Sequence, residues 1–170
     1  MSPLVVRTWA PVGVTPIMRQ KTAMHEKVSC IGALGVSQRR DRLRFYFRLY
    51  PKQNINADRV LPFLDHLLRQ LSGNVVVVWD SWATHRSRKV MAFLANHRRL
   101  RLEYFPPYAP QLNPVEYVWS HSKKNPLANL AAPSLPILTT SARRAGRSVQ
   151  RREGLLRSFL RHSHLPLRLN

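Results

Sequence analysis

The sequence predicts an α/β fold with a mixed sheet flanked by helices, and three observations carry that prediction. Segments with the pattern of β-strands alternate along the chain with segments whose apolar residues recur at helical spacing. The run 75–79, Val-Val-Val-Val-Trp, has the continuous apolarity typical of a strand buried on both faces. The chain has 170 residues, of which 44% are hydrophobic, which suffices for one domain with a core.

The first expected elements form a hairpin. Residues 28–36 are small and apolar, and residues 43–49 alternate apolar with polar side chains, as in a strand with one wet face. The polar segment 37–42 between them predicts a turn. The later elements follow from changes of period, in the order helix 57–71, buried strand 75–80, helix 87–97, strand 100–105 and a helix that begins at Pro114.

The composition changes near residue 126. Prolines at 126, 133 and 136 interrupt the pattern, and Lys and Arg outnumber acids ten to one over residues 117–170. Two short amphipathic helices are expected at roughly 134–149 and 153–162. The sequence therefore divides into a main domain, 1–125, and a basic helical extension, 126–170.

The charge of the chain indicates its class of partner. Lys and Arg number 28 and Asp and Glu only 8, which gives a formal net charge of +20. Such a chain repels itself unless anions screen it, and nucleic acid is the expected partner, well ahead of an anionic membrane. The longest strongly apolar run is too short to span a bilayer and the N-terminus lacks a signal-peptide pattern, so a cytoplasmic protein is expected. The single cysteine, Cys30, excludes an intramolecular disulfide and a multi-cysteine zinc site.

Asp80 is the first candidate for chemistry among the eight acids. It ends the most hydrophobic strand, and the carboxyl ends of strands are where α/β sheets present ligand-binding groups. Burying a carboxylate there without a cation, a proton or a donor is costly. The alternative is a structural role as the N-cap of the next helix.

Glu116 is the second candidate. Asn113 has the pattern of an N-cap and Pro114 that of the first helical residue, which places Glu116 third. Glu116 could therefore be the reciprocal half of a capping box. That alternative leaves unexplained the rigid lead-in Pro106-Pro-Tyr-Ala-Pro-Gln-Leu before the helix.

These residues resemble a known family. Val-Trp-Asp80-x4-His85-Arg is followed, with 35 residues between Asp80 and the acid, by Glu116 in the string Tyr-Ala-Pro-Gln-Leu-Asn-Pro-Val-Glu-Tyr-Val-Trp. Together with Arg-Thr-Trp-Ala-Pro-x-Gly-x-Thr-Pro and Ile-Gly-Ala-Leu, it resembles the DDE transposases, and specifically the bacterial insertion-sequence branch of the mariner-like superfamily. The likeness covers about residues 4–130.

The resemblance implies a ribonuclease-H-like fold and DNA transposition or integration. It implies two Mg²⁺ (or Mn²⁺) ions held by three carboxylates, with Asp80 as the second acid and Glu116 as the third. The implied substrates are the ends of the mobile element and the target DNA. A basic surface suits both.

The sequence departs from the family at its front. The family carries its first acid on a strand shortly before the Arg7-Thr-Trp-Ala-Pro segment, whereas here no acid precedes Glu26. Glu26, Asp41, Asp58 and Asp65 all lack the strand context. We therefore expect the first strand and the first acid to be missing and this chain to be inactive alone. The alternative is a non-catalytic nucleic-acid-binding remnant.

The family's helix-turn-helix module is also absent from the sequence. A frameshift partner, a decayed element and a mis-assigned start all remain open as explanations. An upstream helix-turn-helix product and a second copy of the chain are the implied protein partners.

Further residues are expected around the acid pair. The near-site candidates are His85, Asn113 and Ser81, the last at a position where the family often has Asn. A structural histidine is the alternative for His85. The expected DNA-binding residues, for which a solvated face is the alternative, are Arg86, Arg88, Lys89, Lys123, Lys124, Arg143 and Arg144.

Overall fold

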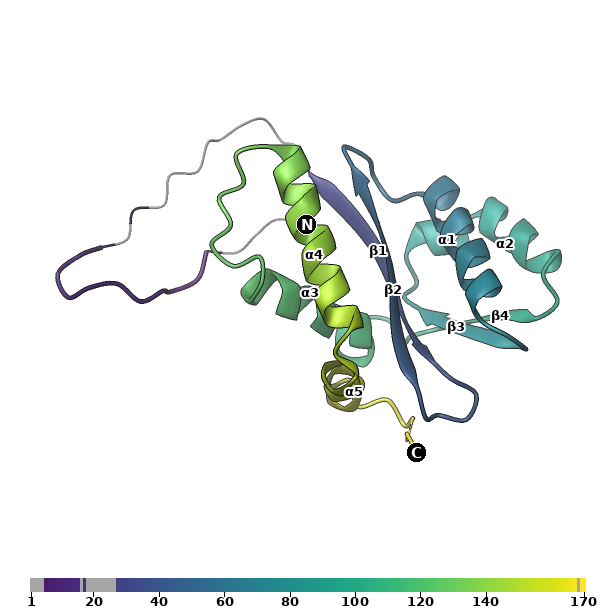
Figure 1. Ribbon diagram of the computed structural model, residues 1–170. Coiled ribbons are helices and arrows are strands. Elements are labelled where there is room, and N and C mark those ends of the chain that lie inside the picture. Colours follow the sequence, from purple (N-terminus) through teal and green to yellow (C-terminus); the bar gives the residue numbers. More distant parts are fainter. Residues whose placement is uncertain (1–4, 16, 18–26, 168) are drawn as a thin grey trace.

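The computed structural model describes the chain except for residues 1–4, 16, 18–26 and 168 (Figure 1). Glu26 therefore lies outside the described residues. The elements follow in the order β1 (Val28–Val36), β2 (Leu43–Pro51), α1 (Ala57–Gln70), β3 (Val75–Trp79), the 3₁₀ turn η1 (Ala83–Arg86), α2 (Arg88–Ala95), β4 (Leu100–Tyr104), η2 (Pro110–Leu112), α3 (Pro114–Lys124), α4 (Leu135–Gln150) and α5 (Glu153–His162). The strand and helix types predicted from the sequence are confirmed, with ends that differ by one or two residues at most positions.

The predicted hairpin is confirmed. β1 and β2 pair antiparallel over nine residues each, with Gly32 opposite Phe47 and Val36 opposite Leu43. Its turn is held by Ser37, whose hydroxyl donates to Asp41 Oδ1 over 2.6 Å and accepts from the Arg42 amide. The Ser37 hydroxyl also lowers the pKa of the Asp41 carboxyl, because it bonds the charged form. Asp41 is thus a turn residue, as expected.

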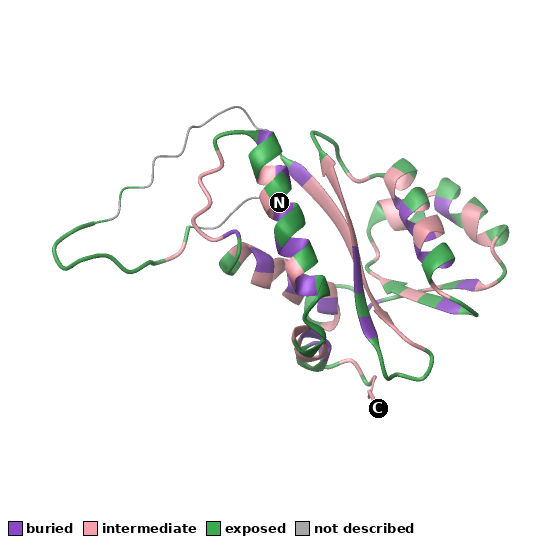
Figure 2. Ribbon diagram, viewed as in Figure 1, coloured by how far each residue is buried: buried purple, intermediate pink, exposed green. Residues whose placement is uncertain are grey.

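The hairpin lies between two groups of elements (Figure 1). On one side α3, α4 and α5 pack against it, around a core that includes Phe45 of β2, Val118 of α3 and Leu156 of α5. On the other side α1 and α2 cover the parallel pair β3–β4, around Val60 and Val90. The buried residues of these helices face inward and their exposed residues face outward (Figure 2).

The prediction that residues 75–80 form a strand buried on both faces is wrong in one respect. The strand exists, but Val76 and Val78 are 57% and 47% exposed, whereas Val75 is buried. The reason is the sheet topology: within the described residues, β1–β2 and β3–β4 are two separate two-stranded sheets. α1 and α2 cover one face of β3, and the other face carries the exposed Val76 and Val78. Among the described residues, the edge of β3 that faces away from β4 has no neighbouring strand.

The C-terminal helices are integral to the packing. α4 and α5 confirm the predicted helices and place Val149, Leu156, Phe159 and Leu160 in the core that they share with β2. Gly146 of α4 lies so close to the Phe47 ring that a Cβ there would meet it at 2.4 Å. The helix and the strand can approach this closely only because position 146 has no side chain.

Cys30 is a free cysteine on β1. Burial raises the pKa of its thiol to about 12, which keeps it protonated and unreactive near neutral pH. Among the described residues, none of the helices combines the length and apolarity needed to cross a bilayer.

Candidate active site

Asp80 follows β3 directly and points into solvent, with 62% of its side chain exposed. Its Oδ1 accepts from the Trp82 amide over 3.1 Å and lies 2.9 Å from His85 Nδ1. The alternative role as a helix N-cap is wrong, because α2 is capped by Ser87, whose side chain accepts from the Val90 amide. The local bonds therefore fix the orientation of one carboxylate oxygen and leave the other free for a ligand.

His85 is held from three sides. Its ring stacks on Trp79 with 4.1 Å between ring centres and 1° between planes, and Trp82 meets it edge-on at 5.7 Å. The Tyr104 hydroxyl donates to the His85 carbonyl at 3.5 Å. The side chain is only 13% exposed, so His85 positions Asp80 and does not project toward solvent.

Trp79 and Tyr104 were not singled out from the sequence. They are register partners on the parallel strands β3 and β4, so their side chains lie on the same face. The position of Trp79 immediately before Asp80 was a usable signal, whereas the pairing with Tyr104 depends on the strand register.

Ser81 and Arg86 form a second small contact beside the acid. Arg86 donates to the Ser81 hydroxyl over 3.0 Å, and its guanidinium lies 5.0 Å from the centre of the Tyr104 ring. The two contacts hold the Arg86 guanidinium against Ser81, the residue that follows Asp80, and against the Tyr104 ring. In these contacts Ser81 orients Arg86, and the Asp80 carboxylate has other partners.

Glu116 is carried by the first turn of α3. The helix begins as the sequence predicts: the Asn113 side chain accepts from the Val115 amide over 3.1 Å and Pro114 takes the first helical position. The capping-box alternative is not what the structure contains, because the Asn113 amide that Glu116 would cap donates to the Pro110 carbonyl within η2. The lead-in segment thus supplies that partner and leaves the Glu116 carboxylate for another use.

The pKa of Glu116 reflects its burial and two nearby charges. The pKa of Glu116 is raised, chiefly because neighbouring protein atoms strip water from its carboxylate, and further by the negative charge of Asp80. The ammonium of Lys123, two turns along the same helix, opposes this and lowers the pKa. A strand end and a helix start separated by 35 residues therefore place two carboxylates within electrostatic range.

This coupling predicts a measurable titration. Replacing Asp80 with Asn should lower the pKa of Glu116, and replacing Lys123 with Met should raise it. NMR titration of the Glu116 carboxyl carbon measures both. Asp58→Asn is the control, since Asp58 does not contribute to the Glu116 shift. An Asp80→Asn protein with an unchanged Glu116 pKa would show that the acids are too far apart to share a ligand.

The raised pKa of Glu116 also makes the stability of the folded protein depend on pH. Because folding raises the Glu116 pKa, the ionised form is disfavoured in the folded state. The contribution of Glu116 to the free energy of unfolding is fully present below its unfolded-state pKa. It is lost as the pH rises through its folded-state pKa. A bound cation would offset this cost at neutral pH.

The donor set fits a hard divalent cation in part. Carboxylate oxygens are the ligands that Mg²⁺ and Mn²⁺ prefer, and a cation would relieve the repulsion between Asp80 and Glu116. Within the part of the chain that the structure describes, no group of three or more His, Cys, Asp and Glu side chains could hold a metal ion. Among the described residues, Asp80 and Glu116 therefore do not form a complete metal site, even with His85 counted as a possible ligand.

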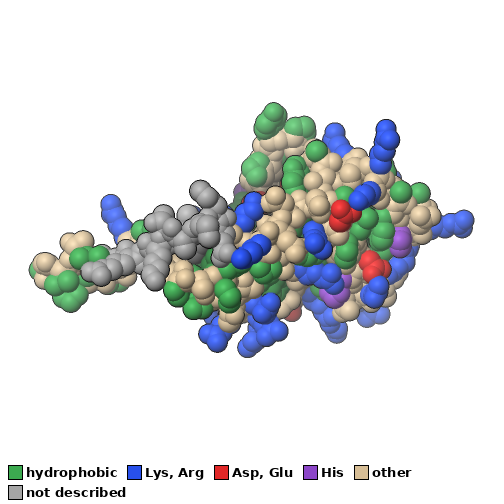
Figure 3. All heavy atoms as spheres, turned by 90° about the horizontal axis from the view of Figure 1, so that it is seen from above, with side chains coloured by type: hydrophobic (Ala, Val, Ile, Leu, Met, Phe, Trp, Pro, Cys, Tyr) green, Lys and Arg blue, Asp and Glu red, His purple; other side chains and the backbone are tan. Residues whose placement is uncertain are grey.

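The expected DNA-binding residues are distributed over several elements. Arg88 is exposed at the start of α2, whereas Lys89 beside it forms a 2.5 Å ion pair with Asp58 of α1. On α3, Lys123 is close enough to act on Glu116, and Lys124 is exposed. Figure 3 shows Lys and Arg side chains spread widely over one face, with few acids among them.

Arg143 and Arg144 lie on a different part of the surface from the α2 cations. Both are exposed on α4, a helix that carries neither acid and packs against β2. The structure therefore does not gather all the predicted cations around the acid pair.

The chain matches one protein family and is similar in fold to several solved structures. Residues 2–138 match the family described as DDE superfamily endonuclease. Among solved structures, the fold is similar to the Mos1 mariner paired-end complex with Mn, with a TM-score of 0.55 and 16% identity over 98% of this chain and 53% of that chain. It is also similar to the Mos1 strand transfer complex, with a TM-score of 0.54 and 14% identity over 98% of this chain and 52% of that chain.

At these identities the likeness establishes the fold, which is ribonuclease-H-like as predicted. The chain spans about half the length of the Mos1 chains that it matches. No curated protein matches the sequence.

Proposed function

This chain belongs to the DDE superfamily endonucleases, and from that membership we propose that it is the catalytic region of a transposase that cleaves and joins DNA strands with divalent metal ions. The single observation that carries the proposal is that Asp80 and the start of α3, the helix that carries Glu116, line the same cavity. The two acids come from a strand end and a helix start, on a chain of charge +20 that suits a polyanionic substrate.

The residues divide into roles. Asp80 and Glu116 would hold Mg²⁺ or Mn²⁺, and metal ions bound there supply activation of a water or 3′-hydroxyl and stabilisation of the leaving oxygen. His85 and the Trp82 amide hold one oxygen of Asp80 in place. Asn113 fixes the helix start that presents Glu116. Arg86, Arg88, Lys123 and Lys124 would neutralise phosphates near the acids.

Finer points of the proposal come from the sequence motifs. The string from Tyr108 to Trp119 supports the bacterial insertion-sequence branch of the mariner-like transposases. Element ends and target DNA are the proposed substrates. A helix-turn-helix product and a second copy of the chain are the proposed protein partners.

We expect the 170-residue chain by itself to cleave DNA little or not at all. Among its described residues, no group of three or more His, Cys, Asp and Glu side chains could hold a metal ion, and loss of one metal ligand typically lowers the rate by orders of magnitude. The test is nicking of supercoiled plasmid with Mg²⁺ or Mn²⁺, run in parallel with Asp80→Asn, Glu116→Gln and Asp58→Asn. Manganese binding, followed by electron paramagnetic resonance, gives a readout that does not depend on activity.

The two readouts separate the outcomes. Weak Mn²⁺ binding that is lost in Asp80→Asn and Glu116→Gln, and kept in Asp58→Asn, supports the metal site. Metal binding unaffected by Asp80→Asn and Glu116→Gln would refute it. Nicking that these two substitutions abolish would show that the chain is already a complete nuclease and would refute the expected inactivity.

A non-catalytic nucleic-acid-binding remnant is the second candidate. One observation favours it: among the described residues, no group of three or more His, Cys, Asp and Glu side chains could hold a metal ion. This candidate predicts DNA binding that is unchanged by Mg²⁺ and by Asp80→Asn.

A further inference from the structure

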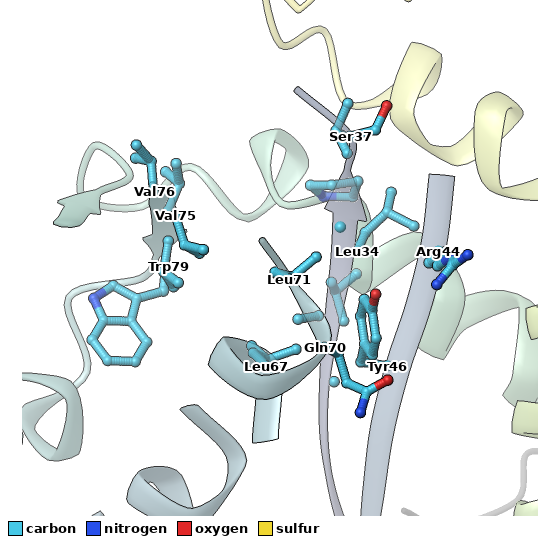
Figure 4. Close-up of a pocket in the computed structure, with 18 of the residues that line it drawn as sticks. Leu34, Ser37, Arg44, Tyr46, Leu67, Gln70, Leu71, Val75, Val76 and Trp79 are labelled. Atoms are coloured by element: carbon cyan, nitrogen blue, oxygen red, sulfur yellow. The ribbon is translucent and has the colours of Figure 1, made fainter. Parts of the chain in front are cut away.

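A cavity of about 810 Å³ lies between the two small sheets, and we propose that it is a slot for one extended peptide strand that pairs with β1 on one side and with β3 on the other. Figure 4 shows Val75, Val76 and Trp79 of β3 on one side of the cavity and Leu34 and Ser37 at β1 on the other. Leu67, Gln70 and Leu71 of the α1 region border it between these walls.

The walls of the cavity are strand edges. Side chains alternate between the two faces of a strand, so a cavity that meets only one face is lined by every second residue. Here every residue from Ile31 to Val36 and every residue from Val75 to Asp80 lines the cavity. Within the described residues β1 pairs only with β2 and β3 only with β4, so both walls present main-chain groups on their unpaired sides.

The burial of β1 supports the same conclusion. Ile31 and Ala33 pack toward α1, and Leu34 and Val36 pack toward the core around α3 and α5. Both faces of β1 are therefore covered, yet all of residues 31–36 are only half-buried. The exposure that remains comes from the open edge, which proteins usually pair or protect.

The lining defines the chemistry of the occupant. Phe63, Leu64 and Leu67 of α1 border the cavity, and so do Val115 of α3 and Leu160 of α5. A strand inserted between these helices must be apolar on both of its faces. Near Asp80, His85 and Asn113 the lining becomes polar, so the strand end that lies there must be polar as well.

A second copy of this chain does not fit the slot. Each strand of a second copy already pairs on one side, so it has one free edge and can satisfy only one wall. An otherwise unpaired segment has two free edges and can bond to β1 and β3 together, as in recognition by strand addition. The occupant we infer is therefore a single extended segment other than the described residues.

The test uses the 170-residue chain, without DNA or metal, and a synthetic peptide. The peptide has an apolar Ile/Val core of about six residues, near the usual length of a strand, and polar ends. The expected results are a rise of several degrees in the melting temperature and slower amide exchange in both segments 31–36 and 75–79, by about tenfold or more. The matched control is the same peptide N-methylated at alternate residues, which keeps the apolar surface and removes main-chain donors.

Substitutions in the chain locate the binding. Val78→Lys should weaken peptide binding at least tenfold, because it places a charge on the wall of the slot, where Val78 is already 47% exposed and tolerates the change in the free protein. Val14→Lys is the matched control, since Val14 is 58% exposed and lies outside the cavity.

Three results would overturn the inference. Equal binding of the N-methylated peptide would mean that the cavity takes apolar groups without pairing. Protection of only one of the two segments would mean that no strand bridges them. Dimerisation that protects both segments in the absence of peptide would make a second copy the occupant. None of these results bears on the metal site, so the inference fails or stands separately from the proposed function.

Discussion

Duplex DNA binding by this chain should weaken by about 10³ to 10⁵ when monovalent salt rises from about 50 to about 200 mM, the range expected for about six to ten phosphate contacts. The reason is counterion release: each phosphate neutralised by Lys or Arg frees condensed cations, and added salt reverses the gain. The chain has 28 such residues against 8 acids. Fluorescence anisotropy of a labelled duplex over a salt series measures the slope of log affinity against log salt.

Substitutions show which part of the surface makes the phosphate contacts that determine this slope. Arg86→Gln with Arg88→Gln tests the cations near the acid pair, and Arg143→Gln with Arg144→Gln tests those on α4. Each lost phosphate contact should reduce the magnitude of the slope by about 0.9. Lys89→Gln is the control for a cation that is already paired, since Lys89 bonds Asp58, and it should change the slope less.

Comparison of the two pairs identifies the DNA face. A reduction confined to the Arg86 and Arg88 variant places DNA over the acids, which the proposed function requires. A reduction confined to the Arg143 and Arg144 variant would place DNA along α4, away from both carboxylates, and would count against a catalytic role. A slope near zero would contradict nucleic-acid binding by these residues.

The sequence predicted the elements well because their signals are local. The Val-rich run at 75–79, the alternation at 43–49 and the cap at Asn113 depend on neighbours a few residues away, and each is confirmed. Asp80 and Glu116 could be paired from the sequence only through the resemblance to a family. In the structure Asp80 and the first residues of α3 line the same cavity, and their pairing as one catalytic site stays a prediction.

The errors concern contacts between distant elements. Continuous apolarity at 75–79 predicts that both faces of the strand are covered, but it does not reveal whether a neighbouring strand is present. Val76 and Val78 are consequently exposed beside a cavity. The contacts that hold His85 could not be predicted from the sequence either. They depend on the pairing of Trp79 with Tyr104 in the strand register, and these residues are 25 positions apart in the chain.

The packing of the basic extension, residues 126–170, also could not be predicted from the sequence, and it leads to a prediction of a large loss of stability. Its composition suggested an appendage, yet Leu156 of α5 is completely buried beside Leu43, Phe45 and Phe159. Leu156→Ala should therefore lower the free energy of unfolding by about 2–5 kcal/mol, from lost burial and the cavity left behind. That is a large share of the roughly 5–15 kcal/mol that stabilises a typical domain. Urea unfolding followed by circular dichroism measures the change.

The control for this substitution is Ile137→Ala on α4, where the side chain is 45% exposed and the expected loss is about 0.5 kcal/mol or less. The form of the transition matters as much as its midpoint. If α4 and α5 belong to the core of the hairpin, Leu156→Ala shifts one cooperative transition that includes the strands. If they formed an independent appendage, the substitution would create an early, separate loss of helix and leave the unfolding of the strands unchanged. Because Phe45 of β2 and Leu156 of α5 share one buried cluster, the single shifted transition is the expected result.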